Sequence, residues 1–251
     1  MDELDEFIVI VEGSSDGPIV TELAERIFVE KGAEWLKNYL PVKFVWSGLK
    51  PDKKAGWSYW KNFEKDVKDL GVRPVMLRGQ KADQKIARKM LHVVTELQKY
   101  RSIRAVVLIW DIDNRPKRRL GLEKAREVHI KAFPELEIVI GMAEPMREAW
   151  VLNGFVAQDG REARILQEYK GKLKFDPCLE SERLRSHSSE MPDRIRNIKI
   201  VTRELTGGDK DREAMCWRET DLDVLRERGS KTGLTAYMEE VESRLLPILE
   251  K

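Results

Sequence analysis

The segment Ala105–Asn114, with the sequence AVVLIWDIDN, constrains the fold of this chain more than any other. Within it, Val106–Trp110 is a run of five apolar residues with no polar residue between them. Strands with one solvated face alternate apolar and polar residues, whereas an unbroken apolar run is typical of a strand buried on both faces of a parallel sheet. The segment therefore predicts a central strand of a parallel sheet.

Two carboxylates follow this apolar run directly, Asp111 and Asp113. Because side chains alternate along a strand, we expect both to point the same way, with Cα atoms roughly 7 Å apart. Open α/β sheets bind ligands at the carboxyl ends of their strands. Two neighbouring carboxylates attract a divalent cation, and Mg²⁺ is the natural candidate. The alternative is a polar turn that leaves the strand, since Asp and Asn are favoured turn residues.

A second unbroken apolar run, Phe7–Val11, precedes the sequence EGSSD at Glu12–Asp16. An amphipathic stretch with a helical period then begins at Ile19. This order predicts a buried strand, a tight turn for which Gly13 gives freedom, and a helix.

The same alternation of strand and helix patterns continues along the first 155 residues. It predicts an α/β fold with a mainly parallel sheet flanked by helices. The expected further strands are Val42–Trp46, at an edge, Pro74–Leu77 and Glu137–Gly141, and the expected helices are Trp60–Leu70, Ala82–Tyr100, Leu122–Ala132 and one beginning at Pro145–Leu152.

A change in composition near residue 155 predicts a domain boundary. Continuous apolar strand patterns stop there, and charged stretches with a helical period follow. We therefore expect an α/β domain at residues 1–155 and a helical C-terminal region at residues 156–251. The expected C-terminal helices are Ala163–Lys170, Pro192–Leu205, Asp211–Trp217 and Leu234–Leu249.

Composition narrows the class of protein. No apolar run approaches the ~20 residues that cross a bilayer, and the acidic start MDELDEF lacks the regions of a signal peptide. We expect a cytoplasmic protein that makes no contact with a membrane. The two cysteines, Cys178 and Cys216, are far apart in the sequence and predict buried thiols rather than a disulfide framework or a zinc site.

Basic residues cluster locally although the net charge is only +2. One run, RPKRR at Arg115–Arg119, lies beside the aspartate pair, and another spans Arg183–Lys199. Such runs are usually solvated faces. Because the first run follows the acids directly, we expect Lys117, Arg118 and Arg119 to contact the phosphates of a nucleic acid.

The V-E-G-x-S-D pattern at Val11–Asp16, together with D-I-D at Asp111–Asp113, resembles the Toprim domain of topoisomerases, primases, recombination proteins and OLD-family nucleases. The resemblance covers roughly residues 6–155. It implies a Toprim/Rossmann-like fold and Mg²⁺ or Mn²⁺ as cofactor. It also implies that Glu12 takes part in acid/base chemistry and metal binding, while Asp111 and Asp113 hold the metal.

The resemblance implies two further metal ligands. Nuclease members place an acid four residues after the motif glutamate, which matches Asp16, and Glu148-Ala149-Trp150 is similar to the E-A-W segment of small stand-alone Toprim-like proteins. The alternatives are a helix N-cap for Asp16 and a charge at a helix start for Glu148. Pro145 biases Glu144 towards an extended conformation, so we expect Glu148 to complete the site, within about 8 Å of Asp111.

The chain departs from topoisomerases and primases, because it has no zinc ribbon and no active-site tyrosine context. The resemblance therefore implies a metal-dependent nuclease that hydrolyses phosphodiester bonds of DNA or RNA, serves in phage defence and works beside a separate ATPase subunit. One alternative is a non-catalytic module that binds nucleic acid or a partner ATPase. A second is a phosphohydrolase with an aspartate nucleophile, but such enzymes usually carry DxD on their first strand, where this chain has Glu12.

Overall fold

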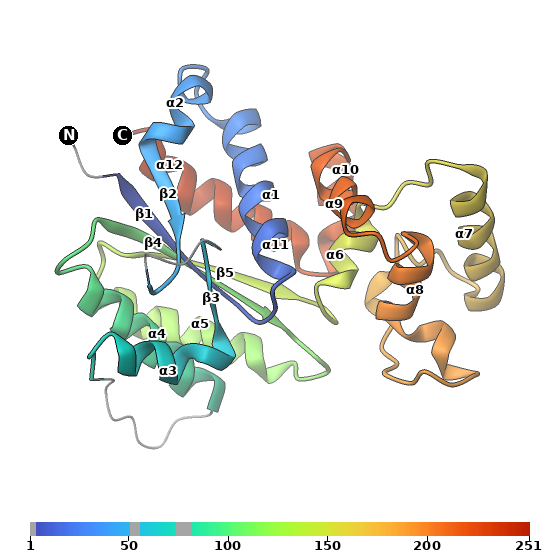
Figure 1. The fold of residues 1–251 in the computed structure, drawn as a ribbon, viewed down its shortest axis with the longest axis horizontal. Coiled ribbons are helices and arrows are strands. Elements are labelled where there is room, and N and C mark those ends of the chain that lie inside the picture. Colours follow the sequence, from blue (N-terminus) through green and yellow to red (C-terminus); the bar gives the residue numbers. More distant parts are fainter. Residues whose placement is uncertain (1–3, 51–55, 74–81) are drawn as a thin grey trace. The chain divides into compact units, whose positions relative to one another are not determined.

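The computed structural model describes residues 4–50, 56–73 and 82–251 (Figure 1). The chain divides into two compact units. Unit 1 contains the chain up to Trp110, then Arg115–Gly141 and Glu239–Lys251, and unit 2 contains Asp111–Asn114 and Met142–Met238. This division differs from a single boundary near residue 155, because the last residues of the chain return to unit 1.

A five-stranded sheet forms the centre of unit 1, as the apolar runs predicted. The strand order is β2-β1-β4-β5, and β3 also pairs with β1. β1 pairs in parallel with β2, β3 and β4. The strands are β1 (Asp5–Val11), β2 (Phe44–Ser47), β3 (Ser58–Tyr59), β4 (Ile103–Asp111) and β5 (Glu137–Ala143). The strand expected at residues 74–77 lies outside the described residues.

The two unbroken apolar runs form neighbouring inner strands. All of Phe7–Val11 in β1 and all of Val106–Trp110 in β4 are buried. The parallel register pairs Ile10 with Leu108, so both strands have their carboxyl ends at the same edge of the sheet. The α/β class and the central position of β4 are thereby confirmed.

Helices cover both faces of this sheet (Figure 1). α3, α4 and α5 lie on one face, and α1 and α12 lie on the other. The α5 helix starts five residues earlier than expected, so the basic run enters its first turn. The elements are α1 (Asp16–Lys31), α2 (Leu36–Lys43), η1 (Trp60–Asn62), α3 (Phe63–Asp69), α4 (Ala82–Leu97), α5 (Lys117–Ile130), the π-helical turn η5 (Val241–Leu245) and α12 (Leu246–Leu249).

Unit 2 is helical in its described secondary structure, apart from the end residues of β4 and β5, as the C-terminal patterns predicted. Aspartate and asparagine side chains cap four of its helices: Asp159, Asn197, Asp209 and Asp221 accept hydrogen bonds from first-turn N–H groups. The elements are α6 (Glu148–Asn153), α7 (Gly160–Leu173), η2 (Ser181–Arg183), η3 (Asp193–Arg196), α8 (Ile198–Leu205), α9 (Lys210–Arg218), α10 (Leu222–Arg228) and η4 (Gly229–Lys231), and α11 (Leu234–Glu240) leads back to unit 1.

The structure bears on two further expectations, the state of the cysteines and the absence of a membrane-spanning segment. Cys178 and Cys216 are buried free thiols, and burial raises the pKa of both, that of Cys216 to about 12. In the described part of the chain, every helix is too short or too polar to cross a membrane.

Candidate metal and nucleic-acid site

Glu12 follows β1 directly and opens the turn that leads into α1. Its side chain is 36% exposed, and Oε2 lies 3.7 Å from Nη1 of Arg118. The guanidinium group of Arg118 is almost fully covered. The carboxylate thus stands at the carboxyl edge of the sheet, as predicted, with a cation beside it.

Asp16 has a structural function in the same turn. It is buried, and its Oδ2 accepts a hydrogen bond of 2.6 Å from the backbone N–H of Gly13. Ser15 holds the N-cap position, but its side chain makes no capping hydrogen bond. Asp16 therefore fixes the turn from inside the helix, which is close to the capping alternative, and its part in metal binding stays a prediction.

The steric need for a glycine lies at Gly17, in the first turn of α1, rather than at Gly13 in the tight turn. A Cβ atom at Gly17 would lie 2.3 Å from the indole ring of Trp57, whereas one at Gly13 would make only ordinary contacts, the nearest at 3.5 Å. The sequence carried no signal for this packing, since Trp57 is forty residues away along the chain.

In unit 2, the segment after β4 is a turn whose backbone is tied to residues 143–147. The N–H groups of Ile112 and Asp113 donate to the carbonyl oxygens of Ala143 and Pro145, at 2.8 and 2.9 Å. The backbone N–H of Arg147 donates to Oδ1 of Asp111 at 2.9 Å. One oxygen of Asp111 is therefore already held in place.

Asp113 and Asn114 have φ angles of 50° and 59°, in the left-handed region. Asp and Asn tolerate this region better than most residues, which accounts for their presence here. β4 ends at Asp111, so strand alternation does not extend to Asp113. The expectation that the two carboxylates share a direction through alternation is therefore wrong, because the backbone turns between them.

Arg147 is a buried cation that no pattern in the sequence indicated. Its Nη2 lies 3.4 Å from Oε1 of Glu148 and 3.5 Å from Oε2 of Glu213. Lys210 also binds Glu213, at 2.8 and 2.9 Å. Glu148 begins α6, as expected, but it has an arginine partner inside unit 2. A metal ion would compete with that partner for the Glu148 carboxylate.

The second basic run of the sequence contributes to this part of unit 2. Arg185 donates to Oε1 of Glu144 at 2.6 Å and to Oδ1 of Asn114 at 3.2 Å. A ring nitrogen of His187 lies 3.5 Å from the amide nitrogen of Asn114. Glu144 is thus ion-paired, and two exposed basic side chains lie against the residue that follows Asp113.

The three basic residues predicted to bind phosphate differ in exposure. Lys117 is exposed and Arg119 is partly exposed, but Arg118 is buried. Its guanidinium group lies 5.5 Å from the ring centre of Trp110 and 4.0 Å from Asp83, as well as near Glu12. The first turn of α5 directs it inward, towards Glu12 and Asp83, so Arg118 is less accessible than Lys117 and Arg119, and its contact with phosphates stays a prediction.

The donor chemistry of the predicted site suits a hard cation, since Mg²⁺ prefers carboxylate oxygens. Among the residues that the structure describes, however, no three acidic, histidine or cysteine side chains come together in a way that would hold a metal ion. The acids at the ends of β1 and β4 each have an internal partner: Arg118 lies beside Glu12, and the backbone N–H of Arg147 donates to Asp111.

Comparison of the chain with family models, with curated proteins and with solved structures gave no match.

Proposed function

We propose that this protein is a Mg²⁺- or Mn²⁺-dependent nuclease that hydrolyses phosphodiester bonds of DNA or RNA. The observation that carries the proposal is the parallel pairing of β1 with β4. Glu12 directly follows β1, and Asp111 is the last residue of β4. Acids at the carboxyl ends of adjacent parallel strands are typical of ligand and metal sites in α/β folds.

In this proposal Glu12, Asp111 and Asp113 supply the oxygen ligands, and Asp16 and Glu148 are further candidates. A bound divalent cation would stabilise the negative charge that develops on the scissile phosphate. Lys117 and Arg119, which are accessible, are the proposed contacts to the phosphate backbone. The proposal also includes a cytoplasmic location, a function in phage defence and a separate ATPase subunit as partner, as the Toprim resemblance implies.

The test is cleavage of supercoiled plasmid, single-stranded DNA and RNA by the full chain, with Mg²⁺, with Mn²⁺ and with EDTA. We expect cleavage only with metal and a loss of at least a hundredfold in Asp111→Asn, because a neutral amide is a poor metal ligand. The amide oxygen can still accept the hydrogen bond from Arg147, so the fold should persist.

The matched control is Asp5→Asn, which changes the same residue type at the amino end of β1. It should cleave like the unaltered chain. Binding of Mn²⁺, followed by electron paramagnetic resonance, should weaken in Asp111→Asn and not in Asp5→Asn. Equal cleavage by both variants, or EDTA-resistant cleavage, would contradict the proposal.

A non-catalytic module is the second candidate, and the internal ion pairs favour it. Arg118 lies beside Glu12, and Arg147 lies between Glu148 and Glu213. Carboxylates that serve as partners of buried arginines have a structural reason to be present. This candidate would be favoured if the protein binds nucleic acid but does not cleave it. The absence of cleavage would have to hold under every metal condition and in the presence of each ATPase tested.

A further inference from the structure

The exposed apolar side chains of this protein are concentrated in one segment of unit 1. Thirteen large apolar residues of the described chain are exposed, and five of them lie between residues 29 and 45. Scattered exposed apolar residues are normal, whereas a concentration of them marks an interaction surface. The five are Val29, Trp35, Tyr39, Val42 and Val45.

The α2 helix is apolar on two sides. Leu36 and Leu40 are buried in unit 1. Trp35, Tyr39 and Val42 have the spacing of one helix face and are 42%, 54% and 64% exposed. A surface helix normally carries polar residues on its outer face. We call these three residues the α2 stripe.

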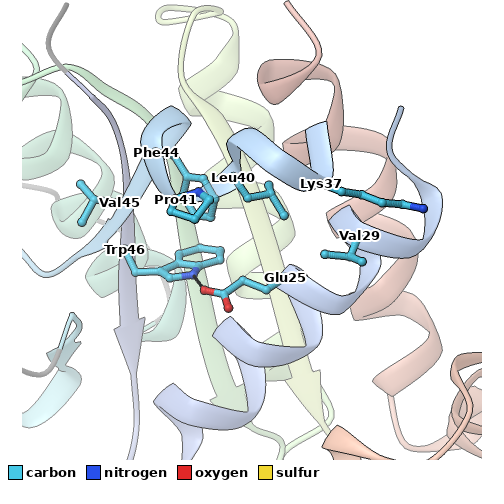
Figure 2. A pocket seen from close by; sticks show the side chains of 8 residues that line it. All are labelled: Glu25, Val29, Lys37, Leu40, Pro41, Phe44, Val45 and Trp46. Atoms are coloured by element: carbon cyan, nitrogen blue, oxygen red, sulfur yellow. Dashed lines mark hydrogen bonds between the residues drawn. The ribbon is translucent and has the colours of Figure 1, made fainter. Parts of the chain in front are cut away.

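A groove of about 430 Å³ lies between α1, α2 and β2 (Figure 2). Lys37, Leu40 and Pro41 line it from α2, so it opens on the other side of this helix from the α2 stripe. Its wall includes the Trp46 indole, which packs against Phe28 and Phe44 with ring centres 6.3 and 5.1 Å away. Packing against buried rings holds Trp46 in one orientation, so a ligand would meet a preformed surface. The groove is lined by Glu25, Val29, Lys37, Leu40, Pro41, Phe44, Val45 and Trp46.

Glu25 places a negative charge in this apolar groove. Its Oε1 accepts a hydrogen bond of 2.7 Å from the Trp46 indole N–H, which is a neutral donor. Within the described residues, no lysine, arginine or histidine lies within ion-pair distance of this carboxylate. Lys37 lines the same groove, but its ammonium group points away from Glu25 and binds Glu34 at 2.7 Å (Figure 2).

We propose that the groove binds a segment of a partner protein in which an arginine or lysine is flanked by apolar side chains. The cation would bind Glu25 beside the Trp46 ring, where a charge pair and a cation–π contact reinforce each other. The flanking apolar side chains would cover Val29 and Val45, which line the groove and are 43% and 42% exposed. This surface belongs to unit 1 alone and is independent of the nuclease proposal.

A second copy of this chain fits the surface less well. Two lysines of α2 are already engaged: Lys37 binds Glu34, and Lys43 lies over the Trp35 ring at 5.1 Å. A symmetric dimer would bring two Glu25 carboxylates and no available cation from this segment.

The test uses a library of random twelve-residue peptides displayed on phage and selected on the full chain. The strongest peptides are then synthesised, and their affinity is measured by fluorescence anisotropy. We expect sequences with one or two basic residues among apolar ones. Glu25→Gln should weaken binding about fivefold, in line with a partly desolvated charge pair, and Val29→Ser with Val45→Ser at least tenfold. Tyr39→Ser with Val42→Ser, on the other side of α2, should leave the affinity unchanged.

Glu30→Gln is the matched control, because Glu30 is an exposed acid of α1 that does not line the groove. It should leave the affinity unchanged. Glutamine at residue 25 keeps an oxygen for the indole hydrogen bond, so the variant tests charge and not folding. Selected peptides without basic residues, or equal binding to Glu25→Gln, would overturn the proposal. So would a dimer in sedimentation experiments that the Val29→Ser and Val45→Ser changes disperse, because a second copy would then be the occupant.

Discussion

At the scale of single residues, buried polar groups have hydrogen-bond partners that the neighbouring sequence does not indicate. His129 is buried on α5, and its Nε2 lies 3.1 Å from the Thr95 hydroxyl of α4. That hydroxyl donates to the carbonyl of Leu91, so the imidazole Nε2 must donate to it. Burial is the main cause that lowers the pKa of His129 to about 4.

The lowered pKa of His129 predicts a loss of stability in acid. In the unfolded chain the imidazole takes up a proton below about pH 6.5, while in the folded protein it stays neutral down to about pH 4. The free energy of unfolding therefore falls as the pH drops through this window. Between pH 7 and pH 4.5 the unaltered chain should lose about 2 kcal/mol more than His129→Gln in urea unfolding experiments.

The control for His129 is His187→Gln, since His187 is exposed. Its stability should follow that of the unaltered chain at every pH. If His129→Gln also follows the unaltered chain, the buried imidazole is not the group that responds to acid.

At the scale of elements, helix propensity and packing act against each other in α1. Gly17 lies in the first turn of this 16-residue helix, where alanine is intrinsically more favourable by about 1 kcal/mol. The Trp57 ring occupies the space that a Cβ atom would need. Gly171 in α7 differs, because a Cβ atom added there would meet no neighbouring side chain or segment within 4 Å.

These two glycines give opposite predictions. Gly17→Ala should lower the free energy of unfolding by about 2 kcal/mol, since the displaced indole strains the core. Gly171→Ala should raise it by up to about 1 kcal/mol through helix propensity alone. Urea unfolding of both variants measures the difference, and a stabilising Gly17→Ala change would show that Trp57 moves aside without strain.

At the scale of the whole molecule, the last residues of the chain complete unit 1. Val241, Leu245 and Leu249 are buried, and the N–H of Ala33 after α1 donates to Oε1 of Glu250 at 3.0 Å. Arg126 of α5 binds both carboxylate oxygens of Glu240, at 2.6 and 2.5 Å. The last two helical segments, η5 and α12, are therefore part of the core of unit 1.

This return of the chain predicts that C-terminal core residues stabilise the N-terminal elements. Leu245→Ala should cost about 3 kcal/mol, because it leaves a cavity at a fully buried position. Hydrogen exchange in α1 should accelerate in the same variant. Leu120→Ala, at a position 45% exposed on α5, is the control and should change stability by less than about 0.5 kcal/mol. A similarly small effect of Leu245→Ala would show that η5 and α12 are not part of the core of unit 1.

The sequence by itself determined the α/β class, the parallel pairing and the positions of the inner strands. An unbroken apolar run such as Val106–Trp110 is typical of an inner strand of a parallel sheet, because such a strand is buried on both faces. It also determined that Glu12 and Asp111 stand at strand ends, because the change from apolar to acidic residues is local. The helical C-terminal patterns were equally visible, since helix periodicity and capping residues depend on neighbours in the sequence.

Only the tertiary structure decided which partners these residues have. The left-handed backbone at Asp113, the burial of Arg118 beside Glu12 and the position of Arg147 between Glu148 and Glu213 all depend on contacts that periodicity does not encode. The same holds for the return of Glu239–Lys251 to unit 1 and for the contact of Gly17 with Trp57. The physical reason is common to all of them: apolar periodicity specifies which face of an element is buried, whereas the identity of the group against that face is set by packing between distant segments.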